Sequence, residues 1–213
     1  MSTTPRRPYQ SDLRNHAAEV TRSRVLNAAK LLFARRGIDG VTIAQIAERS
    51  GVAASTVYAL FKSKEGILRA LMEAALFGPR FQEAQAKLEG IKDPVKLVVL
   101  SAHVARAIYE GESSELGLLR GASAFSSALR KLEQEFEKIR YDMQEERIRL
   151  LFAQTKQRRD ITLDEARRVL WMHTSRDIYR MLVHESGWTP DRYQQWLSET
   201  LVQALVKPSS VSS

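Results

Sequence analysis

Residues 42–65, "TIAQIAERSGVAASTVYALFKSKE", have the spacing of a helix-turn-helix. Counting from Ile43, a small residue falls four positions later at Ala47, and a glycine falls eight positions later at Gly51. A branched apolar residue, Val57, falls fourteen positions later. The small residue lets two helices approach closely, and the glycine permits the positive φ of a tight turn. The stretch therefore predicts two short helices joined by a turn, with Val57 in the space between them.

The residues on either side extend this pattern to a small helical domain. A first helix is expected over residues 20–36, ending at Gly37, where a left-handed stop is favoured. Thr42 is a good N-cap for the next helix, and Ser63 is expected to cap a long fourth helix. One face of the first helix should enter the core, and it consists of Val25, Ala28, Ala29, Leu32 and Phe33.

The rest of the chain is also helical by pattern, so the predicted fold class is all-α, with about nine helices. Residues 95–109, "VKLVVLSAHVARAIY", are apolar nearly all round, which predicts a helix at the centre of a bundle. Gly78 and Pro79 interrupt the fourth helix, because proline removes a backbone donor and clashes with the preceding turn. We expect a kink or a break there.

Composition limits the class of protein. The chain has 213 residues, of which 44% are hydrophobic and 27% charged, as in globular domains. It has no cysteine, which excludes disulfides and thiolate zinc sites. No run of 18 apolar residues occurs, and the first residues lack the apolar segment of a secretory signal. We therefore expect a cytoplasmic protein that is not inserted in a membrane.

Positive charge is concentrated in the first third of the chain. Residues 1–64 carry 11 Lys and Arg against 4 Asp and Glu, whereas residues 65–213 carry 22 against 21. A strongly basic segment ahead of a nearly neutral body suggests that this segment meets a polyanion. Charge alone permits either nucleic acid or an acidic membrane surface.

These residues resemble the tetracycline-repressor (TetR) family of bacterial transcriptional regulators. The resemblance is carried by residues 31–68, "LLFARRGIDGVTIAQIAERSGVAASTVYALFKSKEGIL", and is most specific at 56–65, "TVYxxFxSKE". Residues 179–201 are similar to the last two helices of some members. Leu60 stands where the family often has histidine, and Ala54 and Ala59 replace residues that are often larger or polar. Base recognition is therefore expected to use fewer side chains.

The resemblance implies that the third helix is a recognition helix in the major groove of DNA. Ser55 and Thr56 can hydrogen-bond to bases or phosphates, and alanine methyl groups can contact thymine. The other hydroxyl groups and the lysines are expected to hold phosphates. Tyr58 at the edge of the core and the lysines as an ordinary solvated face are the structural alternatives. The predicted DNA-binding residues are Thr42, Ala53, Ala54, Ser55, Thr56, Tyr58, Lys62 and Lys64.

The resemblance further implies a ligand chamber in residues 67–186, linked by the fourth helix to the DNA-binding domain, with Gly78 as a hinge. An apolar small-molecule effector is expected there, because the central helices are rich in aliphatic and aromatic residues and carry little net charge. Core packing is the alternative for each candidate. The candidate ligand-binding residues are Phe77, Phe81, His103, Arg106, Tyr109, Phe125 and Trp171.

Two C-terminal apolar stripes predict a symmetric homodimer, which paired operator half-sites also require. The first stripe lies over residues 166–182 and the second over residues 193–205. The predicted interface residues are Leu170, His173, Ile178, Met181, Leu182, Leu197, Leu201 and Leu205.

The expected organisation is a flexible basic arm at 1–19, a DNA-binding domain at 20–66, a ligand and dimerisation domain at 67–206 and a disordered tail at 207–213. An enzyme is not expected, because the four histidines show no metal-ligand spacing and no phosphate-binding glycine loop occurs. No cofactor or metal is predicted. The sequence predicts a ligand-responsive regulator, most simply a repressor released from a palindromic operator. A DNA-binding protein without an effector, architectural or constitutive, is the alternative.

Overall fold

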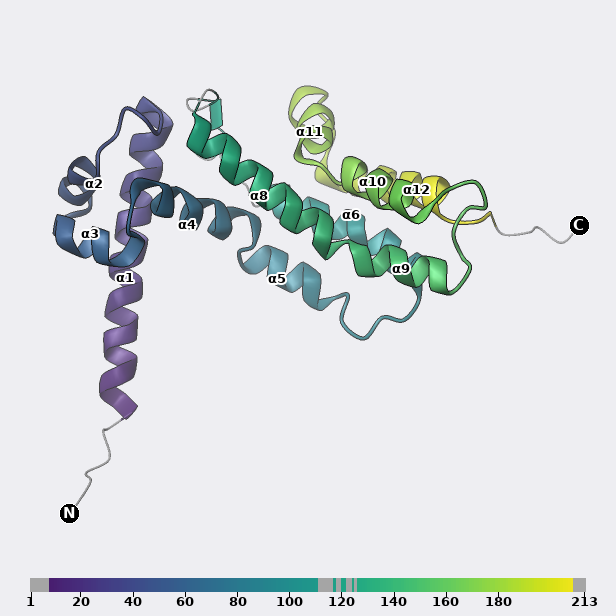
Figure 1. The fold of residues 1–213 in the computed structure, drawn as a ribbon, viewed down its shortest axis with the longest axis horizontal. Helices are drawn as coiled ribbons and strands as arrows, with labels where there is room; N and C mark the ends of the chain where they lie inside the picture. The colour runs from purple at the N-terminus through teal and green to yellow at the C-terminus, as the bar shows by residue number, and fades with distance from the viewer. Residues whose placement is uncertain (1–7, 111–116, 118–119, 122–123, 125, 209–213) are drawn as a thin grey trace, which may run out of the picture. The chain divides into compact units, whose positions relative to one another are not determined.

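The computed structural model describes residues 8–110, 117, 120, 121, 124 and 126–208, and these are helical almost throughout (Figure 1). The all-α prediction is confirmed, since the described residues form no sheet. They divide into two compact units. The first holds the described residues up to Glu73 and those between 117 and 130, and the second holds 74–110 and 131–208.

The first unit contains α1 (Pro8–Arg36), α2 (Ile43–Ser50), α3 (Ala54–Phe61) and most of α4 (Lys64–Leu76). α2 packs against α1 and α3 packs against α2. All five residues predicted for the inner face of the first helix are buried. Gly37 ends that helix with a φ of 68°, as the sequence predicts.

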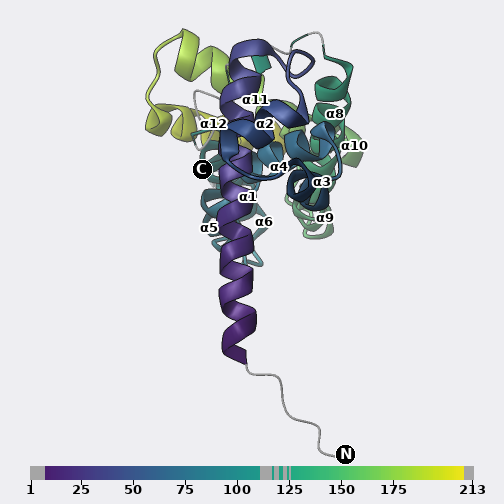
Figure 2. The same cartoon turned by 90° about the vertical axis from the view of Figure 1, so that its left-hand side faces the viewer.

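The start of α1 differs from the sequence prediction. We expect a flexible arm up to residue 19, but α1 begins at Pro8. Proline is tolerated in the first turn of a helix, where its missing N–H has no intrahelical partner. Residues 16–20 are exposed, and Figures 1 and 2 show the first half of α1 extending away from α2 and α3. Apolar periodicity gives no signal for exposed helical residues such as 16–20.

The second unit is built around α6 (Pro94–Glu110), which contacts α5 (Pro79–Ala86), α9 (Glu145–Ala153) and α12 (Pro190–Leu205). Nine residues of α6 are buried, which confirms its predicted central place. The remaining elements are α8 (Ser127–Met143), α10 (Leu163–His173), α11 (Arg176–Tyr179) and the π-helical η1 (Arg180–Glu185). α10 lies beside α12 and α9.

The predicted break at Gly78 is confirmed. α4 ends at Leu76, Gly78 is the N-cap of α5, and Pro79 is the first residue of α5. A Cβ on Gly78 would lie 2.4 Å from the carbonyl oxygen of Ala74. Only glycine therefore fits this junction without displacement of the backbone.

Four leucines of the predicted dimer interface lie instead in the core of the single chain. Leu170, Leu197, Leu201 and Leu205 are all 0% exposed within the single chain, because α10 and α12 pack against their own neighbours. Periodicity shows that a helix has an apolar face but not whether the same chain covers it. Of the other predicted residues, Met181 is 40% exposed. The half-buried ones are His173, Ile178 and Leu182.

Candidate DNA-binding helices and effector pocket

A capping box fixes the start of α2. The Gln45 backbone N–H donates to Thr42 Oγ1 at 3.3 Å, and the Thr42 backbone N–H donates to Gln45 Oε1 at 3.0 Å. Both bonds satisfy N–H groups that a helix start leaves without partners. Ile46 and Ala47 are buried one turn further on. The hydroxyl of Thr42 is thus engaged by its own helix, while the residue itself is exposed.

The turn between α2 and α3 has the geometry that its glycine predicts. Gly51 has a φ of 63°, and the Val52 N–H donates to the Ala47 carbonyl at 3.1 Å. Arg24 of α1 donates from Nη2 to the Ser50 carbonyl at 2.7 Å and lies 2.8 Å from where a Cβ of Gly51 would be. Arg24 therefore clamps the turn onto α1. Sequence reasoning missed this residue, because an exposed arginine on a helix carries no pattern.

α3 has one buried face and one exposed face. Val57 is 0% exposed and Phe61 is also buried, whereas Tyr58 is 52% exposed. Ala53, Ala54 and Ser55 are exposed as well, and Thr56 is half-buried. The exposure of Tyr58 rules out the alternative that it belongs to the core. The outward face of α3 thus presents hydroxyl and methyl groups at its N-terminal end.

The junction between α3 and α4 is tight. Lys62 ends α3 with a φ of 67°, and its N–H donates to the Tyr58 carbonyl at 2.9 Å. Ser63 caps α4, as predicted, by accepting from the Gly66 N–H at 3.1 Å. Lys64 is the first residue of α4 and is half-buried, and Lys62 is exposed. Both lysines lie near a helix N-terminus, where backbone N–H groups also favour an anion.

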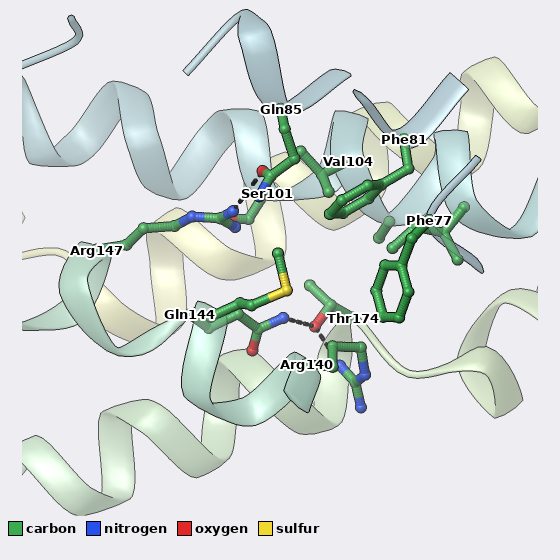
Figure 3. A pocket seen from close by; sticks show the side chains of 12 residues that line it. Phe77, Phe81, Gln85, Ser101, Val104, Arg140, Gln144, Arg147 and Thr174 are labelled. Carbon is green, nitrogen blue, oxygen red and sulfur yellow. Dashed lines mark hydrogen bonds between the residues drawn. The ribbon is translucent and has the colours of Figure 1, made fainter. Parts of the chain in front are cut away.

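A cavity partly open to solvent lies in the second unit between α5, α6, α8 and α9 (Figure 3). It encloses about 20 Å³, and the empty space including its open side is about 350 Å³. Phe77 and Phe81 face it, with ring centroids 5.2 Å apart. The two phenylalanines stand on either side of Gly78 and Pro79. The lining residues are Phe77, Phe81, Gln85, Ser101, Val104, Ala105, Ile108, Arg140, Met143, Gln144, Arg147 and Thr174.

Of the predicted ligand-binding residues that the structure describes, Phe77 and Phe81 line this cavity and the other four do not. His103 lies within hydrogen-bonding distance of Lys87 Nζ and Gln194 Oε1. Arg106 pairs with Glu110 at 2.8 Å and Asp191 at 2.5 Å.

Two aromatic candidates, Tyr109 and Trp171, also lie elsewhere. Tyr109 is buried and donates to the Thr174 carbonyl at 3.1 Å. Trp171 packs its ring edge-on against Tyr141. Phe125 lies outside the described residues. The partners of Tyr109 and Trp171 favour the core-packing alternative.

The polar residues of the cavity were missed by sequence reasoning. Arg140 donates to the Trp171 carbonyl and to Thr174 Oγ1, both at 2.8 Å, and pairs with Glu137 at 2.5 Å. Arg147 donates to Ser101 Oγ at 3.0 Å and to Gln85 Oε1 at 2.9 Å. The sequence does contain a sign that Arg147 points inward. Arg147 precedes the buried Leu151 by four positions, so the two residues share one face of the helix.

Residues 25–71 match the model of the bacterial regulatory proteins of the tetR family. The HTH-type transcriptional repressor KstR2 of Rhodococcus jostii is 32% identical over 106 residues, which are 45% of this chain and 51% of that repressor. The helix-turn-helix of this chain is thus similar to that of tetR-family regulators. The family match covers the helix-turn-helix described above. The match to KstR2 spans about half of that protein's length.

Solved structures of similar fold extend over most of the chain. NalD of Pseudomonas aeruginosa, the secondary repressor of the MexAB-OprM multidrug efflux pump, has a TM-score of 0.70 at 23% identity, covering 91% of this chain and 100% of NalD. FadR of Bacillus subtilis in complex with stearoyl-CoA has a TM-score of 0.66 at 18% identity, covering 84% and 97%. At these identities the likeness shows the fold. No described helix is long and apolar enough to cross a membrane.

Proposed function

We propose that this chain is a cytoplasmic repressor of the tetR family that binds an inverted-repeat operator as a homodimer and is released by a small molecule. The observation that carries the proposal is the exposed face of α3 beside a glycine turn in the helix-turn-helix that matches the family. Ser55 and Thr56 read base edges, and the methyl groups of Ala53 and Ala54 contact thymine. The similarity to a repressor, KstR2, supports repression over activation.

Phosphates are held around the recognition helix. The phenol of Tyr58, together with Lys62 and Lys64 at the α3–α4 junction, contacts the DNA backbone and fixes the register of α3. The hydroxyl of Thr42 accepts from the Gln45 backbone N–H and so fixes the start of α2. Because Thr42 is exposed, the same hydroxyl can donate to a phosphate. The net positive charge of residues 1–64 creates an electrostatic potential that attracts DNA.

The dimer interface is formed by the exposed apolar side chains of α10 and η1. Met172 and Met181 are the large apolar side chains that remain exposed among residues 145–208. The half-buried Val169 and His173 share the face of α10 with Met172 at helical spacing. A second copy covering this face would bury these side chains and place two recognition helices on one operator.

The cavity of the second unit is the effector site. Phe77 and Phe81, which face it, flank the break at Gly78, and α4 connects that break through the chain to Lys64 beside the recognition helix. A ligand that moves these rings biases the α4–α5 junction and thereby the placement of α3. The complex of the structurally similar FadR with stearoyl-CoA supports a small-molecule effector.

Thermodynamic reciprocity tests this function. A duplex containing an inverted repeat from upstream of the chain's own gene is titrated by fluorescence anisotropy with and without a ligand of the cavity. The ligand must weaken operator binding by the same factor by which the operator weakens ligand binding. Equal ligand affinity in the presence and absence of operator would exclude release by that ligand, and equal affinity for the repeat and a scrambled duplex would exclude sequence-specific regulation.

A further inference from the structure

Arg147 places a positive charge in the wall of the cavity, and none of the carboxylates that the structure describes neutralises it. Its side chain is only 8% exposed, and its hydrogen bonds go to two neutral oxygens, those of Ser101 and Gln85. No carboxylate among the described residues pairs with it. Burial lowers the pKa of Arg147 to about 10, so the guanidinium is still charged at neutral pH. A buried charge without a partner is expensive to maintain.

The other buried arginine of the cavity has the partners that usually compensate for burying a charge. Arg140 is buried to the same extent but forms an ion pair with Glu137 and donates to two further oxygens, on Trp171 and Thr174. Two of the five N–H groups of Arg147, in contrast, are used in hydrogen bonds of the described residues. Arg147 therefore retains donor capacity and charge that no residue in the described part of the chain uses.

A second polar group of the cavity also lacks a partner. Gln144 is buried, and its Nε2 donates to Thr174 Oγ1 at 2.9 Å, but its Oε1 has no hydrogen-bond partner among the described residues. Buried polar atoms in folded proteins nearly always have one. Gln144 Oε1 can be satisfied only by an N–H or O–H group of a ligand, and the guanidinium of Arg147, one helical turn away, by an acid group. Both observations indicate that a polar part of a ligand binds at this end of the cavity.

The cavity separates these polar groups from its apolar ones. In Figure 3 the Phe77 and Phe81 rings lie at one side, and Arg147, with its bonds to Ser101 and Gln85, lies at the other. Val104 and Ile108 of α6 continue the apolar wall. A wholly apolar ligand would leave the guanidinium unpaired, and a cationic one would be repelled by it.

We propose that the effector is an amphipathic anion, with an acid group bound by Arg147 and an apolar body packed against Phe77 and Phe81. This inference rests on the proposed role of the cavity as the effector site and defines the ligand's class. It replaces the wholly apolar effector expected from composition, because overall charge does not reveal one buried arginine. A carboxylate and a phosphate monoester share the required chemistry, since each accepts two N–H bonds from one guanidinium.

Three compounds with the same ten-carbon chain separate the head group from the chain: decanoate, decyl phosphate and 1-decanol. Their binding to the full chain, without DNA, is measured by isothermal titration calorimetry. We expect the tighter acid to bind about 10-fold to 100-fold more tightly than the alcohol, as for a buried charge-assisted hydrogen bond. The identity of the tighter acid distinguishes a carboxylate from a phosphate effector. Failure of both acids to bind more tightly than 1-decanol would overturn the inference.

Variants assign this preference to Arg147. Arg147→Met should abolish the preference for the acids while changing the affinity for 1-decanol less than about threefold, since the apolar wall is intact. Arg149→Met is the matched control, because Arg149 lies on the same helix, is 63% exposed and pairs with Glu145. It should keep the full preference. Equal loss in both variants, or equal weakening of acid and alcohol by Arg147→Met, would contradict the assignment. If Arg147→Met does not fold, Arg147→Lys should retain a preference for the acids over the alcohol.

Operator binding is measured separately, so that the two proposals can fail independently. If the preferred acid binds through Arg147 but leaves operator affinity unchanged, the ligand class stands and the release mechanism is wrong. If operator affinity responds as strongly to 1-decanol as to the preferred acid, the release mechanism stands and the anionic class is wrong.

Discussion

Lys64 is the first residue of α4 and directly follows Ser63, which caps that helix; α3, the proposed recognition helix, ends just before it. If it contacts phosphate once in each subunit, Lys64→Ala removes two contacts from the dimer. The slope of log affinity against log salt should then flatten by roughly 1.8, at about 0.9 per contact, on operator and random DNA alike. Lys96→Ala, an exposed lysine of α6, should leave the slope unchanged. An unchanged slope in Lys64→Ala combined with altered base preference would show that α4 is not docked in this way.

Ser55 lies on the exposed face of α3, near its N-terminal end. Ser55→Ala should cost about 1–3 kcal/mol of operator binding for the lost base contact, because each good base contact contributes about that much discrimination. Affinity for random DNA and the salt slope should stay the same. Anisotropy titrations at several salt concentrations measure all three quantities. An equal loss on both kinds of DNA would place Ser55 on phosphate instead.

Gly78 decides the geometry of the α4–α5 junction. Because a Cβ would lie 2.4 Å from the Ala74 carbonyl oxygen, Gly78→Ala must displace the backbone. We expect a loss of about 1–3 kcal/mol in the free energy of unfolding, measured by urea denaturation. Gly121→Ala is the control, since its Cβ would meet nothing within 4 Å. It should change stability by less than about 0.5 kcal/mol. Equal effects of the two variants would mean that the junction tolerates a side chain.

The helices of the first unit could be predicted because their signals are local. Gly37 and Gly51 adopt the positive φ that their positions require, and Thr42 and Ser63 cap the helices they precede. The interior of the second unit could not be predicted to the same depth. Arg147 enters the cavity through the packing of α9 on α6, a contact between residues far apart in sequence.

The apolar stripes of α10 and α12 also show what sequence pattern cannot predict. They indicate burial correctly, but Leu170 and Leu197 are covered by their own chain. Hydrophobic pattern alone does not separate an intrachain core from an interface between copies. The proposed interface rests on the exposure of Met172 and Met181, which depends on how the neighbouring helices pack.

At the scale of the whole molecule, we expect a dimer at micromolar concentration by light scattering. Met181→Arg should yield monomers and weaken operator binding, because it places a charge in the apolar contact while leaving α3 untouched. Ile139→Arg is the matched control, since Ile139 of α8 is equally exposed at 40%. It should stay dimeric. A monomeric native chain, or dissociation of both variants, would remove the proposed interface.

Selection of bound duplexes from a pool of random DNA by the full chain tests the central claim most directly, since it requires neither a known operator nor a known effector. The account predicts enrichment of one inverted repeat, with two half-sites that match the two-fold symmetry of a dimer. The double variant Ser55→Ala with Thr56→Ala should lose or change that sequence while still retaining DNA. A pool without enrichment, or a single half-site without its inverted partner, would contradict a dimeric, sequence-specific regulator.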